Sequence, residues 1–155
     1  MQIQCQSRLR WNPSVEVDPE LAWGLAPSNF PILIVNEDMR SADSLKRTLH
    51  DLGYLTTFTA YSARRALTAV VDFSPAVALL DLELPDMTGY QLASKLRAHL
   101  SNVVRRVPLL AVAELHKFGN AELTRAAGFM GCLSKPVEPD ALNALLGKLQ
   151  SGKSS

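Results

Sequence analysis

The chain has 155 residues, of which 47% are hydrophobic and 20% charged, and its formal net charge is +1. These values are typical of one globular domain with short additions, and the near-zero charge gives no reason to expect a nucleic acid or an anionic membrane as partner. No apolar run approaches the roughly 20 residues that span a bilayer. The N-terminus lacks the apolar core of a signal peptide. The two cysteines, Cys5 and Cys132, show no metal-ligand spacing, so we expect reduced thiols in a cytoplasmic protein.

Residues 1–30 differ from the rest of the chain. They contain three prolines and little periodicity, which predicts an N-terminal arm or linker, yet both tryptophans, Trp11 and Trp23, lie here. Two interpretations stay open: a poorly ordered terminus, or an arm packed on the domain or on a second subunit. At the other end, residues 150–155 are Gln, Ser, Gly and Lys and are expected to form a disordered tail.

From residue 31 the sequence alternates between strands and helices. The apolar run 32–35 predicts a buried strand, and apolar residues at helical spacing after it predict a helix that Gly53 ends. Residues 55–60 alternate with threonines, as an edge strand does. Ser62 is expected to cap the next helix. The predicted buried stripe of that helix comprises Ala63, Ala66, Leu67, Val70 and Val71.

The second half of the chain repeats this pattern. The run 77–81 predicts a central buried strand that ends on Asp81, and a loop rich in Pro and Gly follows it. A third helix, a strand at 109–113, a helix ending at Gly128 and a strand at 129–133 come next. Pro139 opens the last helix. The apolar residues expected in the third and last helices are Ala93, Leu96, Leu100, Leu142, Leu145, Leu146 and Leu149.

Five strands alternating with helices predict an α/β domain over residues 31–149, built on a doubly wound five-stranded parallel sheet. Right-handed crossovers favour the flavodoxin-like strand order 2-1-3-4-5. In that order the first and third strands are neighbours, so Glu37 and Asp81 converge at their tips. Lys135, at the tip of the fifth strand, reaches the same crevice.

Carboxylates beside a lysine at such a switch point suit a phosphate together with a hard cation. Mg²⁺ takes oxygen ligands and keeps several waters, a lysine supplies a point charge for phosphoryl oxygens, and a carboxylate can itself be the nucleophile. The alternative is a stabilising Asp–Lys pair that binds no ligand.

Residues 31–149 resemble the receiver domain of two-component response regulators. The resemblance rests on the order and spacing of several short pieces. These are Ile32-Leu33-Ile34-Val35 with its acidic tip, Leu79-Leu80-Asp81, Leu84-Pro85-Asp86-Met87-Thr88-Gly89-Tyr90, Val107-Pro108-Leu109, Ala127-Gly128 and Lys135-Pro136.

The resemblance implies a role for four residues. Asp81 matches the acidic residue that accepts a phosphoryl group from a histidine kinase or a histidine phosphotransfer protein. Glu37 matches a Mg²⁺ ligand, and the backbone carbonyl of Glu83 matches a second one. Lys135 matches the lysine that contacts the phosphoryl group.

Three residues depart from the family pattern. Asn36 stands where the family has Asp or Glu, so one negative charge is lost and Mg²⁺ affinity should fall. Ala113 replaces the Thr or Ser whose hydroxyl binds a phosphoryl oxygen. Cys132 replaces the Tyr, Phe or His whose rotamer follows the neighbouring loop. Both parts of the usual switch are therefore missing.

Two functions follow. One is a phosphoacceptor receiver with altered switching, which the retention of Asp81, Glu37 and Lys135 favours. The other is a degenerate receiver that docks proteins independently of phosphorylation, which the three departures favour. A flavin or nucleotide enzyme on the same fold is less favoured, because the sequence has no glycine-rich phosphate loop.

Partners are implied by the resemblance as well. A histidine kinase or phosphotransfer protein is expected to dock near residues 39–49. The fourth helix, fifth strand and fifth helix, at about 114–149, are the expected output face and the surface for a possible homodimer. No helix-turn-helix follows Leu149, so direct DNA binding is not expected.

Overall fold

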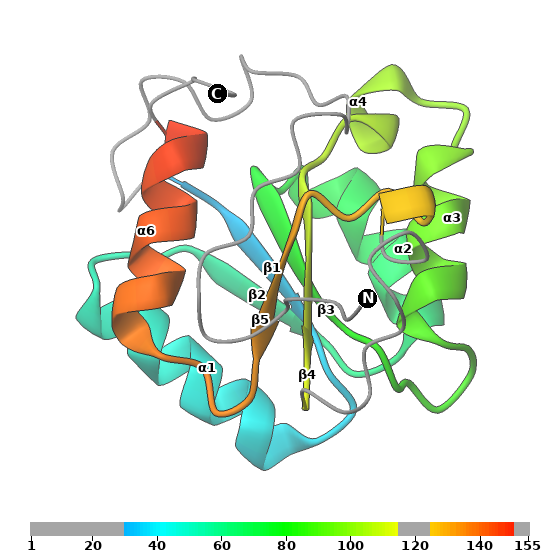
Figure 1. The fold of residues 1–155 in the computed structure, drawn as a ribbon. Coiled ribbons are helices and arrows are strands. Elements are labelled where there is room, and N and C mark those ends of the chain that lie inside the picture. Colours follow the sequence, from blue (N-terminus) through cyan, green and yellow to red (C-terminus); the bar gives the residue numbers. More distant parts are fainter. Residues whose placement is uncertain (1–29, 115–124, 151–155) are drawn as a thin grey trace.

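The computed structural model describes residues 30–114 and 125–150. Within these ranges the chain forms five strands and the helices that connect them (Figure 1). None of the described helices is long and apolar enough to cross a membrane. The elements are β1 (Ile32–Val35), α1 (Met39–Asp51), β2 (Thr57–Ala60), α2 (Ala63–Phe73), β3 (Val77–Asp81), α3 (Gly89–Arg97), α4 (Asn102–Arg105), β4 (Leu109–Ala113), β5 (Gly131–Ser134) and α6 (Pro139–Gln150).

The strands form one parallel sheet in the order β2-β1-β3-β4-β5. β1 pairs with both β2 and β3, and β4 lies between β3 and β5. This topology confirms the predicted flavodoxin-like, doubly wound fold. Because all strands run in one direction, the segments that follow β1, β3 and β5 meet at the same edge of the sheet.

Helices cover both faces of the sheet: α1 and α6 lie on one face, and α2 and α3 on the other (Figure 1). Every residue of β1, β3, β4 and β5 is buried. Alternate side chains enter the two cores: Ile34 and Val112 pack with α1 and α6, whereas Leu33 and Leu80 pack with α2 and α3. The uninterrupted apolar runs of the sequence follow from this two-sided burial.

Local side chains define where the helices begin and end. Ser62 caps α2 as predicted, and Thr88 caps α3 in a reciprocal capping box with Gln91. After α1 the chain turns at Gly53, whose φ is 100°. This left-handed conformation favours glycine, so the predicted stop is confirmed.

Two predicted core residues are exposed. Val71 is 52% exposed, and Ala69 is buried on α2 instead; Val71 follows Val70 by one residue, which turns it about 100° away from the buried stripe. Leu100 is 95% exposed because α3 ends at Arg97, and Leu92 is buried in its place. The short helix α4 was not expected, although its cap, Ser101, is a typical one.

The chain ends of the domain differ slightly from expectation. Phe30, expected to close the arm, is buried, and its ring centroid lies 5.8 Å from that of Tyr54. The predicted tail begins one residue too early, since Gln150 is the last residue of α6 and accepts a 2.6 Å hydrogen bond from the Tyr54 hydroxyl. The predicted arm up to residue 29, most of the helix before β5 and the tail from residue 151 lie outside the described residues.

Gly89, at the start of α3, has no room for a side chain. A Cβ there would collide with the backbone carbonyl of Asp81 and lie 2.8 Å from the Cα of Leu82. We expect Gly89→Ala to lower the free energy of unfolding by about 1–3 kcal/mol, as overpacking does, when measured by urea denaturation.

Gly147 provides the matched control for that substitution. It lies inside α6, and a Cβ there would meet nothing within 4 Å. Gly147→Ala should therefore keep or raise the stability, by up to about 1 kcal/mol, because alanine is the better helix former. Equal stability of the two variants would contradict the close approach at Gly89.

Candidate functional site

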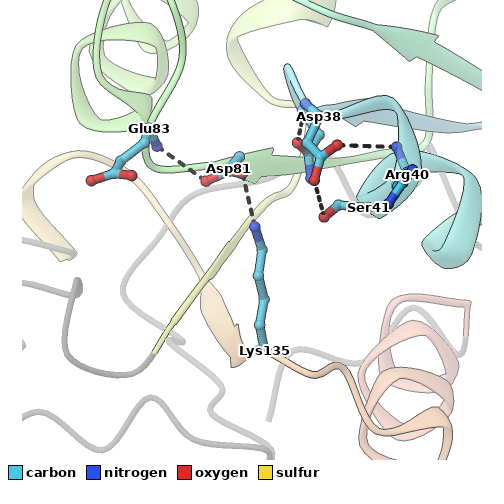
Figure 2. A network of polar contacts seen from close by, with 7 residues as sticks. Asp38, Arg40, Ser41, Asp81, Glu83 and Lys135 are labelled. Atoms are coloured by element: carbon cyan, nitrogen blue, oxygen red, sulfur yellow. Dashed lines mark hydrogen bonds and ion pairs between the residues drawn. The ribbon is translucent and has the colours of Figure 1, made fainter.

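The centre of the site is Asp81, the last residue of β3. It is 8% exposed, and its Oδ2 lies 3.0 Å from the Nζ of Lys135. Lys135 follows β5, and its backbone amide donates to the carbonyl of Ala113 at the end of β4. Figure 2 shows the lysine side chain extending from the end of β5 toward Asp81. The structure thus brings together the predicted acceptor and the predicted phosphoryl-binding lysine, 54 residues apart in sequence.

The second oxygen of Asp81 is held by the loop that follows β3. The backbone amide of Glu83 donates to Oδ1 at 3.1 Å, while the Glu83 side chain is exposed. Among the described residues, each carboxylate oxygen of Asp81 therefore has one hydrogen-bond partner. Since a carboxylate offers about four lone-pair positions, each oxygen can accept a further ligand.

Asn36 and Glu37 lie at the tip of β1, the strand next to β3. Asn36 is 4% exposed, and its Oδ1 accepts a 2.8 Å hydrogen bond from the backbone amide of Asp38. Its side chain thereby stabilises the turn into α1. Glu37 is exposed at the same edge of the sheet, so its carboxylate is accessible to a ligand.

Asp38 serves as the N-cap of α1 and not as part of the central pair. It accepts hydrogen bonds from the amide of Arg40 and the hydroxyl of Ser41 (Figure 2). These bonds, with a weaker contribution from the charge of Lys135, lower the pKa of its carboxyl. The cap is thus ionised at neutral pH and is lost only as the pH falls through that lowered value.

The two switch positions are buried, and Cys132 is disulfide-bonded, so the reduced thiol predicted there is wrong. Ala113 ends β4, and Cys132 lies in β5; each is 2% exposed, and both pack in the core on the α2 and α3 side of the sheet. Ala113 pairs with Ser134, directly before Lys135. Its methyl group thus stands close to the site but offers no hydrogen bond.

The magnesium ligands that the sequence predicts lie at this edge of the sheet. The predicted set comprises the carboxylates of Asp81 and Glu37 and the backbone carbonyl of Glu83, which are hard ligands suited to Mg²⁺ with several waters retained. Within the described residues no group of three or more His, Cys, Asp and Glu side chains is placed to hold a metal. The predicted set has two carboxylates and one carbonyl, and it carries less negative charge than an acidic residue at position 36 would give.

A cavity of about 380 Å³ adjoins the site on the side of α1. Lys135 and Asn36 line it together with hydroxyl-bearing residues of α1. Its lining comprises Asn36, Ser41, Ser44, Leu45, Thr48, Val112, Glu114, Lys135, Pro136 and Val137.

A family model of the response regulator receiver domain matches residues 32–147. The chain belongs to this family. Among proteins similar to this receiver domain, Response regulator Rre1 of Synechocystis is 26% identical over 118 residues, which cover 76% of this chain and 50% of Rre1. The polar-differentiation response regulator DivK of Brucella abortus is 26% identical over 106 residues, 68% of this chain and 84% of DivK. The chain thus spans about half the length of Rre1 but most of DivK.

Solved structures give the same family. Chemotaxis response regulator CheY4 of Vibrio cholerae superimposes with a TM-score of 0.67 at 25% identity, over 77% of this receiver domain and 97% of CheY4. A CheY-like receiver domain from Methylobacillus flagellatus gives a TM-score of 0.69 at 26% identity, over 77% and 98% of the two chains.

One residue of the motif at 84–90 had no role of its own in the sequence interpretation. Asp86, at the tip of the loop after β3, accepts hydrogen bonds from the backbone amides of Ala63 and Arg64. A contact between segments 22 and 23 residues apart leaves no signal in local sequence pattern.

Proposed function

We propose that this receiver domain accepts a phosphoryl group on Asp81 within a His–Asp phosphorelay. The observation that carries the proposal is the 3.0 Å contact between Asp81 and Lys135 at the carboxyl edge of the sheet. In the transfer, a carboxylate oxygen of Asp81 forms a bond to phosphorus, and the bond between phosphorus and the donor's imidazole nitrogen breaks. Lys135 balances charge on the transferring group, because its ammonium already lies beside the acceptor.

Magnesium is the proposed cofactor, held by Asp81, Glu37 and the carbonyl of Glu83. When bound, it supplies positive charge to the phosphoryl oxygens. The neutral side chain of Asn36 removes one charge from the site, and its Oδ1 is engaged with the amide of Asp38. We therefore expect weaker Mg²⁺ binding than in a receiver with acidic residues at both positions.

Switching is proposed to be altered. Ala113 offers no hydroxyl to a phosphoryl oxygen, and such a hydrogen bond to a charged acceptor is worth about 1.5–3 kcal/mol. Cys132, buried in β5, replaces the aromatic side chain that usually follows the neighbouring loop. Phosphorylation must then change the protein's output surface through other residues. A bound group shifts a conformational equilibrium only if it binds one of the two states more tightly.

The proposed partners are a histidine kinase or phosphotransfer protein, which would dock beside α1 and the cavity next to Lys135. A homodimer through the face at about 114–149 is a further proposal, with cytoplasmic location and no enzymatic turnover. The second candidate function, phosphorylation-independent docking, is favoured by the uncharged Asn36 and by Ala113, which offers no hydroxyl to a phosphoryl group.

The test is intact-protein mass after incubation with Mg²⁺ and acetyl phosphate, with a parallel sample containing EDTA. A gain of one phosphoryl group that requires Mg²⁺ is the expected result. If no gain appears, the incubation is repeated with a histidine kinase and ATP. Absence of label from both donors would contradict the acceptor function and leave the docking module as the better account.

A further inference from the structure

The loop between β3 and α3, residues 82–88, is fixed where it begins and ends. The amide of Glu83 donates to the Oδ1 of Asp81 at 3.1 Å, and the amide of Gly89 donates to the carbonyl of Leu82 at 2.8 Å. Glu83 and Thr88 also form an isolated antiparallel bridge across the loop. These contacts lie at its base and leave its tip, Pro85 and Asp86, projecting outward with exposed side chains.

The tip is tied instead to the start of α2. Asp86 Oδ1 accepts the amide of Ala63 and Oδ2 accepts the amide of Arg64, both at 2.9 Å. Two bonds from one planar carboxylate fix both its position and its orientation. The same bonds lower the pKa of the Asp86 carboxyl, so that it is ionised at neutral pH.

This attachment is more than the helix requires for its own start. Ser62 already caps α2 by accepting the amide of Arg65 at 3.2 Å. Arg64 is exposed, so water could satisfy its amide, whereas Ala63 is fully buried. Asp86, which belongs to another segment, accepts the amides of the two residues before Arg65, namely Ala63 and Arg64. Its distinct effect is to join the loop that carries Glu83 to a rigid helix.

We propose that Asp86 is a positioning residue for the magnesium site, because it holds the loop in the conformation that presents the Glu83 carbonyl to the ion. The inference rests on the proposed function. Mg²⁺ demands a nearly ideal octahedral arrangement of ligands, and a backbone carbonyl on a loop meets this demand only if the loop is fixed. With the side chain of Asn36 uncharged, the site has less charge to compensate for a misplaced ligand.

The test compares Asp86→Ala with Ser62→Ala in the full chain. Each substitution removes a cap from α2, so both should lower the thermal unfolding temperature in EDTA, but only Asp86 joins the loop to α2. We expect Asp86→Ala to weaken Mg²⁺ binding about tenfold, as loss of a supporting contact around a metal does, and Ser62→Ala to leave it unchanged. Asp86→Asn, which retains one acceptor oxygen, should give an intermediate dissociation constant. Calorimetric titration with MgCl₂ gives these values, and equal affinities in Asp86→Ala and Ser62→Ala would overturn the proposal.

A second measurement separates this proposal from the acceptor function. Amide hydrogen exchange in EDTA should become faster at Glu83 and Gly89 in Asp86→Ala but not in Ser62→Ala. If the native chain binds no Mg²⁺, the proposed metal site fails and the metal role of Asp86 fails with it. Faster exchange in Asp86→Ala would in that case still show that Asp86 fixes the loop to α2, whereas unchanged exchange would contradict this role as well.

Discussion

Asp81→Asn is expected to abolish phosphorylation of this receiver domain by acetyl phosphate. Asparagine has nearly the same shape, and its amide oxygen can keep the hydrogen bond from the Glu83 amide. However, it cannot form the acyl phosphate, and it removes the negative partner of Lys135. The intact mass of the variant should therefore stay unchanged under conditions in which the native chain gains one phosphoryl group.

The matched control is Asp72→Asn, which changes an exposed carboxylate on α2. This variant should be labelled as fully as the native chain. Peptide mapping of the native protein locates the label independently. Label on the Asp81→Asn protein would assign the acceptor to another carboxylate, and loss of label in Asp72→Asn would point to a general effect on folding.

The strands and their order could be predicted because they depend on short-range pattern. β1, β3 and β4 are uninterrupted apolar runs, and such runs occur where a strand is covered on both faces. Asp81 was found because it ends the apolar run of β3, and Lys135 because it follows Ser134 at the end of β5. Strand polarity alone then requires the two residues to share one edge of the sheet.

The prediction was wrong where burial depends on exact helix limits. Leu100 has the spacing of a buried residue, but it lies three residues beyond the end of α3. Val71 sits at the border of a narrow stripe, and one step of the helix turns it outward. Apolar residue type could not distinguish Val71 from its buried neighbour Val70.

Arg97 illustrates what composition conceals. A basic residue in the last turn of a helix is typically a solvated one, yet its guanidinium donates to the backbone carbonyls of Arg105, Val107 and Gly128. Burial lowers the pKa of this side chain to about 10, so it stays charged at neutral pH. The residue joins three segments that only the folded chain brings together, as Asp86 does at the other end of α3.

Asn36→Asp is expected to tighten Mg²⁺ binding about tenfold, or by about 1.4 kcal/mol. The introduced carboxylate can keep the hydrogen bond from the Asp38 amide, because it retains an acceptor oxygen at the same place. It adds a negative charge next to the strand that ends in Asp81, at a position only 4% exposed. Without metal, this extra buried charge should lower the thermal unfolding temperature.

The two effects together give a specific signature. Binding to the folded state stabilises a protein in proportion to the logarithm of ligand concentration over dissociation constant, so MgCl₂ should raise the unfolding temperature of Asn36→Asp more than that of the native chain. Asn102→Asp, the same change at an exposed position on α4, should respond like the native protein. If all three proteins respond equally, position 36 does not contribute to a metal site, and the uncharged Asn36 cannot explain weak Mg²⁺ binding. A stronger response of Asn36→Asp alone would instead place the ion at the ends of β1 and β3, where Asp81 can serve as one of its ligands.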